Sequence, residues 1–268
     1  MSSGVKEKVN VQEEILEQSG PVFNPPLYLQ RYTAVRDILY KVPGIEKVVD
    51  FGCAEGNFIK YLMKLPFVTE IACVDVNEPC LEQAAYRSKP KAWDFIFKRH
   101  EALTVKLFKG SVAEKDCRFQ GFNAVTCIEL IEHLEADDLL PLVSNIFGYI
   151  QPKIAIFTTP NCEFNVLFPS LTGFRHWDHK FEWSRTEFKQ WCEDITDKYP
   201  DYTVDIQGIG EPPSESRNLG CCSQLAIFKM KCPLNEKIIP TNDNAEEKYI
   251  LIDENKFPGR VNENLRKE

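Results

Sequence analysis

The chain has 268 residues, of which 43% are hydrophobic, 12% aromatic and 27% charged, and this composition excludes a largely disordered protein. Its 32 Lys and Arg against 40 Asp and Glu give a net charge of −8, which argues against a broad electrostatic grip on a long nucleic-acid duplex but permits a local contact. No apolar run approaches the roughly 20 residues that span a bilayer, and the first residues carry no hydrophobic signal core. We therefore expect a cytoplasmic protein without membrane insertion.

Composition also divides the chain into one folded unit and two polar flanks. Residues 1–20 are predicted to form a flexible N-terminal segment, and residues 233–268 a polar C-terminal tail that contains one short apolar run, YILI at 249–252. Residues 21–232 then form a single domain. The ten cysteines include no C-x-x-C pair, and several lie in apolar runs, which favours reduced, buried thiols over disulfides or a zinc site.

In chain order, short β-rich runs alternate with helical patterns between the flanks. Such alternation predicts an α/β fold with parallel strands joined by right-handed helical crossovers. The last two strands are separated by the Gly/Pro/Ser-rich residues 210–220, so we expect a mostly parallel sheet of seven strands whose last strand is antiparallel. The expected strands are 47–51, 71–76, 104–108, 123–128, 153–159, 203–209 and 224–230, and the expected helices are 28–41, 57–65, 78–87, 137–150 and 184–197.

The first strand runs into a glycine turn that carries Asp50, Gly52 and Gly56. It differs from the dinucleotide fingerprint, because Ala54 and Asn57 stand where G-x-G-x-x-G requires glycine. An acid before such a turn suits a ligand with an ammonium group rather than an anionic pyrophosphate, and S-adenosylmethionine is such a ligand. The turn would lie at the carboxyl edge of the sheet, where α/β folds bind their ligands.

Two further strand ends support a nucleotide site. Asp75 ends the second strand, 25 residues after Asp50, at the spacing where a carboxylate accepts hydrogen bonds from ribose hydroxyls. Gly110 and Ser111 end the third strand, where the base would lie. One such turn alone is as often an ordinary tight connection, but three strand ends in register favour a cofactor site built from Asp50, Gly52, Gly56, Asp75 and Ser111.

The fourth strand ends in Cys127-Ile128-Glu129-Leu130-Ile131-Glu132-His133-Leu134. If the chain turns helical after the strand, Glu129, Glu132 and His133 share one face and converge on one point. Carboxylates with an imidazole favour Mg²⁺ or Mn²⁺, and the lack of cysteine ligands disfavours structural zinc. The alternative is a helix N-terminus that attracts Glu through its dipole.

Two more histidines lie in the polar and aromatic segment 174–183. His176 and His179 are both candidates for a fourth ligand, and the spacing does not choose between them. The aromatics of this segment can stack on a base or anchor the following helix. His100 lies in the basic stretch 87–109, where we expect a surface residue on a solvated face.

Over residues 21–231 the chain resembles the small-RNA 3′-terminal 2′-O-methyltransferases, the Hua-enhancer family, which methylates Piwi-bound and similar small RNAs. Two of the matching strings, C-I-E-L-I-E-H-L and D-H-K-F-E-W, are specific, whereas the Asp-Gly turn is shared by many methyltransferases. The matching segments are Phe23-Asn24-Pro25-Pro26-Leu27-Tyr28-Leu29-Gln30-Arg31-Tyr32, Asp50-Phe51-Gly52-Cys53, Cys127 to Leu134, Thr159-Pro160-Asn161, Glu163-Phe164-Asn165 and Asp178-His179-Lys180-Phe181-Glu182-Trp183.

The resemblance implies a Rossmann-like class I S-adenosylmethionine-dependent methyltransferase domain over 21–232. It further implies catalysis at a Mg²⁺ or Mn²⁺ ion whose shell is completed by both hydroxyls of the last ribose. His133, or a water nearby, would accept the proton. The implied metal and catalytic residues are Glu129, Glu132, His133 and His179, and the implied RNA contacts are Phe23, Pro25, Pro26, Gln30 and Arg31. His176 has no metal role in the family pattern, and Ala54 departs from the third glycine of many methyltransferases.

By the same resemblance, the substrate is the 3′ end of a single-stranded small RNA of the Piwi-interacting type, presented by a Piwi/Argonaute-type protein. We expect a cytoplasmic monomer, with ribonucleoprotein granules as a further location. Two rival functions are a metal-independent small-molecule methyltransferase, in which the Glu/His cluster is structural, and a non-catalytic adaptor for an RNA end or a Piwi-type protein.

Overall fold

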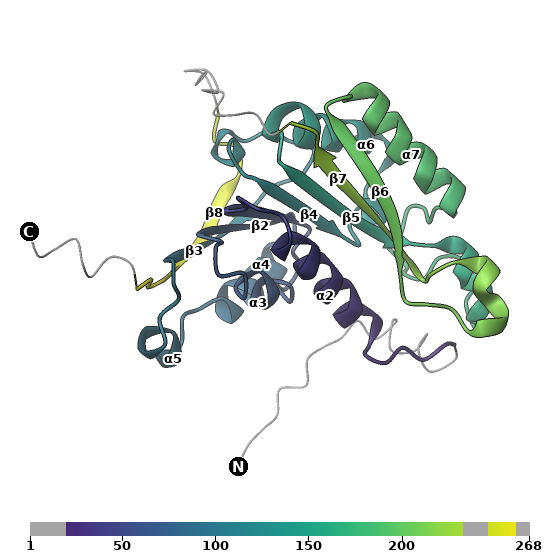
Figure 1. Ribbon diagram of the computed structural model, residues 1–268, viewed down its shortest axis with the longest axis horizontal. Helices are drawn as coiled ribbons and strands as arrows, with labels where there is room; N and C mark the ends of the chain where they lie inside the picture. Colours follow the sequence, from purple (N-terminus) through teal and green to yellow (C-terminus); the bar gives the residue numbers. More distant parts are fainter. Residues whose placement is uncertain (1–19, 233–245, 261–268) are drawn as a thin grey trace, which may run out of the picture.

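The computed structural model describes residues 20–232 and 246–260, and these form a twisted sheet with helices on both faces (Figure 1). The sheet has eight strands in the order β6-β7-β5-β4-β1-β2-β3-β8. The strands are β1 (Lys47–Phe51), β2 (Glu70–Asp75), β3 (Leu103–Lys109), β4 (Ala124–Ile128), β5 (Ile154–Pro160), β6 (Tyr202–Ile209), β7 (Ser223–Met230) and β8 (Ile250–Phe257).

The predicted strands β1 to β7 all form, and the predicted pairing is confirmed. β3, β2, β1, β4 and β5 are parallel neighbours, and β7 lies antiparallel between β5 and β6. The carboxyl ends of five parallel strands therefore meet at one edge of the sheet. This edge is where folds of this class bind ligands.

The prediction of seven strands and a polar tail after 233 is wrong for β8, which pairs antiparallel with β3. Asp116 holds the chain that enters this strand, since its Oδ2 accepts hydrogen bonds from the backbone N–H groups of Lys248 at 2.7 Å and Tyr249 at 2.8 Å. Tyr249 is buried, and its ring packs on Phe119 with centroids 5.1 Å apart. The predicted flexible segment 1–20, save Gly20, and the rest of the tail lie outside the described residues.

Two helical layers cover the sheet. On one face α2, α3 and α4 bury Val35, Ile59 and Leu81 against strand residues such as Val48, while on the other α6 and α7 pack against the opposite side chains. This division follows from the alternation of side chains along each strand. The helices are α2 (Leu27–Tyr40), α3 (Ile59–Leu62), α4 (Glu78–Arg87), α5 (Ala92–Ile96), α6 (Ala136–Val143), which continues as the π-helix η3 (Ser144–Ile150), and α7 (Arg185–Lys198).

Two differences from the predicted helices affect the surface. α3 is shorter than expected, and α5 lies in the stretch that was expected to be only a solvated face. All ten cysteines are free thiols, as the lack of C-x-x-C pairs predicts. Among the described residues, no helix combines the length and the apolar character needed to cross a bilayer.

Candidate active site

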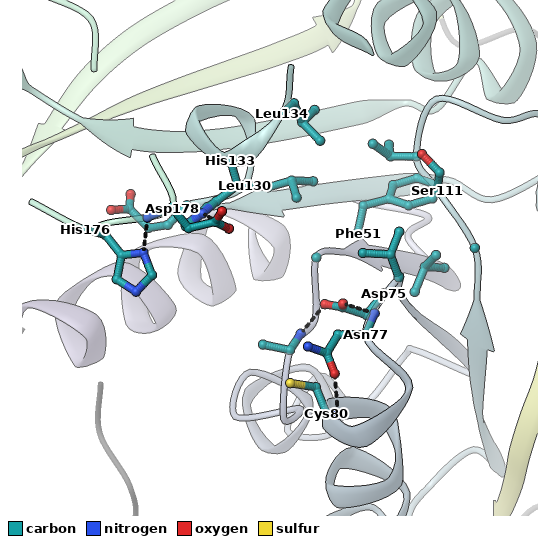
Figure 2. Close-up of a pocket in the computed structure, with 17 residues that line it drawn as sticks. Phe51, Asp75, Asn77, Cys80, Ser111, Leu130, His133, Leu134, His176 and Asp178 are labelled. Atoms are coloured by element: carbon teal, nitrogen blue, oxygen red, sulfur yellow. Dashed lines mark hydrogen bonds and ion pairs between the residues drawn. The ribbon is translucent and has the colours of Figure 1, made fainter. Parts of the chain in front are cut away.

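A cavity of about 430 Å³ opens at the carboxyl edge of the sheet (Figure 2). Gly52, Asp75 and Ser111 line it from the ends of β1, β2 and β3, and Glu129 and His133 line it from the segment after β4. The predicted cofactor residues of the second and third strand ends therefore share one space with two of the predicted metal ligands. A methyl donor and an acceptor held by a metal would need this arrangement.

The glycine turn has a geometry that excludes a side chain at Gly52. This residue has a φ of +71°, and an added Cβ would lie 2.7 Å from Leu130 Cδ1. Asp75 fixes the turn from the next strand, because its Oδ2 accepts a hydrogen bond from the Ala54 N–H at 2.8 Å and its Oδ1 one from the Asn77 N–H at 2.8 Å. Each carboxylate oxygen has a second lone pair, so Asp75 can still accept a hydrogen bond from a ribose hydroxyl.

Asp50 and Gly56 are not among the residues that line this cavity, so their contact with the cofactor stays a prediction. The Asp50 carboxylate is buried in the sheet, where Thr126 Oγ1 donates a hydrogen bond to it at 2.7 Å. Burial, partly offset by that hydrogen bond, raises the pKa of Asp50 to about 7. Gly56 instead lets the turn approach α4, since an added Cβ would lie 2.9 Å from the Cβ of Ala84. Both residues shape the turn from behind.

The segment after β4 departs from the predicted α-helix. Glu129 has a φ of +49°, and its N–H donates to the backbone oxygen of Thr158 at 3.0 Å on the neighbouring strand. A short 3-10 helix, η2 (Ile131–His133), follows. The carboxylates are therefore positioned by a left-handed residue and a tight turn rather than by one face of an α-helix.

Each carboxylate of this segment has one oxygen held by a protein donor. Arg31 Nη1 lies 3.2 Å from Glu129 Oε2, and Thr159 Oγ1 donates to Glu132 Oε2 at 3.0 Å. The two other oxygens, Glu129 Oε1 and Glu132 Oε1, are buried and have no hydrogen-bond partner among the described residues. Burial and the charge of Glu129 raise the pKa of Glu132 well above its usual range. Two buried carboxylate oxygens left in this way fit the ligand set of a hard divalent cation.

Three imidazoles form a cluster at this edge of the sheet, since ligand atoms of His133, His176 and His179 all lie within 4.8 Å of one another, and this group includes neither Glu129 nor Glu132. His179 Nδ1 is 2.6 Å from Glu182 Oε1, and His133 Nδ1 is 3.3 Å from Asp178 Oδ2. A ring that donates its Nδ1–H to a carboxylate presents the lone pair of Nε2, which is the usual arrangement of a metal-binding histidine. Burial, followed by the proximity of His179, lowers the pKa of His133 and favours its neutral form.

His176 has the opposite hydrogen-bond pattern. Its Nδ1 accepts a hydrogen bond from the backbone N–H of Asp178 at 3.2 Å, so the neutral ring carries its proton on Nε2. That tautomer offers a donor where a ligand would need a lone pair. Of the two candidates that the spacing left open, His179 therefore has the geometry of a ligand.

Of the five predicted RNA contacts near the start of the domain, Arg31 is buried, Pro25 is exposed and the other three are half-buried. Arg31 is only 5% exposed and also donates to Ser223 Oγ at 3.3 Å, which places it beside Glu129 inside the domain instead of on the surface. Phe23 packs on Phe164 with ring centroids 6.0 Å apart. Gln30 Nε2 donates to the backbone oxygen of Pro25 at 2.7 Å, Pro26 is half-buried, and Pro25 is exposed.

Several supporting residues were missed by reasoning from sequence. Thr126 and Thr159 lie inside apolar strands, where nothing in the pattern marks them as donors to Asp50 and Glu132. Glu182 had a weak signal, because it follows His179 by three residues within the D-H-K-F-E-W string.

Comparison with known proteins agrees with this geometry. Residues 13–195 match a family model described as a methyltransferase domain. The chain is 39% identical over 267 residues to the small RNA 2′-O-methyltransferase of Drosophila melanogaster, covering 94% of this chain and 68% of that protein. The enzymes of the same name from Xenopus tropicalis and Rattus norvegicus are 40% and 44% identical, covering 86% and 77% of this chain but only 62% and 52% of their own lengths. The chain thus spans about half to two thirds of these relatives.

Solved structures give the same result. The crystal structure of the small RNA methyltransferase HEN1 superposes with a TM-score of 0.74 at 27% identity, covering 96% of this chain and 29% of that one. The methyltransferase domain of bacterial CtHen1-CN superposes with a TM-score of 0.64 at 34% identity, covering 76% of this chain and all of that one.

The fold and the cavity together define a Rossmann-like methyltransferase of the S-adenosylmethionine-dependent class. Within that class, the chain belongs to the small RNA 2′-O-methyltransferase family, as the sequence resemblance predicted.

Proposed function

We propose that this chain transfers the methyl group of S-adenosylmethionine to the 2′-hydroxyl of the 3′-terminal nucleotide of a single-stranded small RNA, in a reaction that depends on Mg²⁺ or Mn²⁺. The observation that carries the proposal is the pair of buried oxygens, Glu129 Oε1 and Glu132 Oε1, that have no hydrogen-bond partner among the described residues. Carboxylates orient the imidazoles of His133 and His179, and Glu129 and His133 line the cofactor cavity. The names of the relatives supply the substrate class.

The residues that would hold the ion are Glu129, Glu132, His133 and His179. A divalent ion bound there would act as a Lewis acid that lowers the pKa of an oxygen ligand by several units. Only a terminal nucleotide has both ribose hydroxyls free, because an internal 3′-oxygen is part of a phosphodiester. A site that requires the hydroxyl pair therefore selects RNA ends.

The chain's own contribution is to fix these groups in advance. Arg31 and Thr159 hold one oxygen of each glutamate, and Glu182 holds the His179 ring. Because His133 Nε2 has one lone pair, it serves as a ligand or as a proton acceptor but not as both. We assign His133 to the ligand set and the proton to water, which the open cavity admits.

We also propose that a Piwi/Argonaute-type protein presents a Piwi-interacting RNA to this site, and that the enzyme acts as a monomer in the cytoplasm, including ribonucleoprotein granules. The relatives' names support the small-RNA part of this assignment.

Transfer of labelled methyl to a short RNA tests the function directly. The RNA with a complete 3′-terminal ribose should be labelled, whereas RNAs that end in 2′-deoxyribose or a 3′-phosphate should not, because each lacks the hydroxyl pair. Equal labelling of the 2′-deoxy RNA would remove the proposed acceptor. Full activity in the presence of a strong chelator would instead favour a metal-independent enzyme.

His179 and His176 offer a matched pair of variants. His179→Ala should abolish transfer and be partly rescued by excess Mn²⁺, whereas His176→Ala should retain substantial activity, because only His179 presents its Nε2 lone pair. The opposite result would show that the ligand set is wrong.

A further inference from the structure

A second cavity, of about 490 Å³, lies behind the glycine turn and has a strongly cationic wall. Lys60, Arg87, Lys89 and Lys91 line it, together with Tyr86, and no carboxylate side chain does. In a chain with a net charge of −8, four cations around one cavity form a local exception. Such a cavity attracts anions, which the net negative charge of the chain otherwise repels.

This basic cavity and the cofactor cavity share structural elements. Gly52 and Ala54 line the cofactor cavity, while Gly56 and Asn57 of the same turn line the basic one. Helix α4 connects them as well, because Cys80 in its first turn lines the first and Arg87 at its end lines the second. The ten residues of α4 span about 15 Å, a distance that a few nucleotides can cover.

One of the cations is fixed in place before any ligand binds. Arg87 Nη1 donates to the backbone oxygen of Glu55 at 3.3 Å and to the side chain of Asn57. Lys89 and Lys91 follow it on the short connection to α5, and both are exposed. A guanidinium held in this way is suited to a phosphate, because little side-chain entropy is lost on binding.

Aromatic rings stand exposed beside these cations. Tyr86, Trp93, Phe95 and Phe97 are 55 to 77% exposed, and the Trp93 and Phe97 rings lie 4.2 Å apart. In Figure 1, α5 stands apart from the other helices at the lower left. Residues 86–99 contain five basic side chains and one acidic one. Proteins that bind single-stranded nucleic acids typically combine cationic side chains, which contact the phosphate backbone, with exposed aromatic rings on which the bases stack.

We propose that the basic cavity and α5 bind the body of the RNA whose 3′ end occupies the active site, with phosphates in the cavity and bases against Tyr86 and Trp93. This inference rests on the proposed function and adds a second anchoring point to it. The charge complementarity favours a polyanion, and the exposed rings favour one with bases over an acidic peptide.

Fluorescence anisotropy of the full chain with a labelled single-stranded RNA of about 20 nucleotides tests the proposal. The double variant Lys89→Ala/Lys91→Ala should bind this RNA several-fold more weakly, and the slope of log K against log salt should fall by about 1.4, or about 0.7 for each lost phosphate contact. Trp93→Ala should weaken binding at least about fivefold through lost stacking. The control Lys198→Ala/Lys229→Ala removes the same charge from exposed positions on α7 and β7, and should leave the affinity and the slope unchanged.

A trinucleotide with the same 3′ end separates this inference from the proposed function. Its KM for methylation should be the same in the wild type and in Lys89→Ala/Lys91→Ala, while the KM of the longer RNA should rise only in the variant. If the wild type and the variant each methylate both RNAs with equal KM, RNA binding by the basic cavity and α5 is refuted and the proposed function stands. If the wild type methylates neither, the function fails. Stronger binding of a poly-glutamate peptide than of RNA at these lysines would overturn the choice of occupant.

Discussion

Replacing Glu182 by glutamine should weaken metal binding while leaving the chain folded. The Glu182 carboxylate is buried and accepts three hydrogen bonds of 2.6 Å, from His179 Nδ1, the Arg175 backbone N–H and Asn165 Nδ2. Burial alone would raise the pKa of Glu182, but these hydrogen bonds outweigh it and hold the pKa below its usual range. The wild-type group is therefore an anion that polarises the His179 ring.

The magnitude follows from what glutamine can and cannot replace. Its carbonyl oxygen can still accept from His179 and Arg175, but its NH₂ group would face Asn165 Nδ2, and two donors cannot pair. The lost bond should reduce the free energy of unfolding by about 1 to 3 kcal/mol. Loss of the negative charge behind His179 should lower metal affinity about 10- to 100-fold, or about 1.4 to 2.7 kcal/mol.

Calorimetric titration with Mn²⁺ measures the affinity, and urea unfolding measures the stability. His176→Ala is the matched control, because its Nδ1 accepts from the backbone and its ring is not held by a carboxylate there. It should change the Mn²⁺ affinity by less than about twofold. An unchanged affinity in Glu182→Gln, together with a large loss in His176→Ala, would refute the argument from tautomers.

Three further predictions concern the support of the site. Asp50 should make the free energy of unfolding depend on pH, because the folded state keeps a proton on this carboxylate up to a pKa of about 7. In urea unfolding, wild-type stability should fall by up to about 1.4 kcal/mol per pH unit between about pH 4 and 7 and then level off, and Asp50→Asn should remove this dependence. Asp116→Ala leaves the N–H groups that lead into β8 without their acceptor, so it should lower the free energy of unfolding by about 3 kcal/mol and expose the C-terminal strand to protease. Gly56→Ala should cost about 2 to 4 kcal/mol, seen as a lower Tm, because of its φ of +74° and its contact with Ala84.

Much of the fold could be predicted from the sequence because its signals are local. Each strand from β1 to β7 is a short run rich in β-branched and apolar residues, so its position could be read directly. β8 could not be identified in this way, because only its first residues are apolar and the rest read D-E-N-K. Its stability comes from pairing with β3 and from Asp116, and both partners are more than 100 residues away.

In the candidate site, too, local signals could be predicted from the sequence and long-range contacts could not. Glu129, Glu132 and His133 could be selected by type and spacing, and His179 by the family resemblance alone, yet the expected reason for the convergence of the first three, an α-helical face, was wrong. A helix would have needed only local geometry, whereas the actual turn depends on a bond from Glu129 to Thr158 of the adjacent strand.

Arg31 illustrates the most consequential gap between sequence and structure. An arginine in a segment expected to meet RNA would naturally be assigned to a phosphate, but this one is buried and pairs with Glu129. Burial, followed by repulsion from the Glu129 charge, raises the pKa of Glu132 well above its usual range. A guanidinium behind Glu129 reduces the repulsion while leaving Glu129 Oε1 directed away from it and unpartnered. The same pairing ties α2 to the candidate site, so the geometry of the Glu129 carboxylate and the packing of α2 depend on each other in this chain.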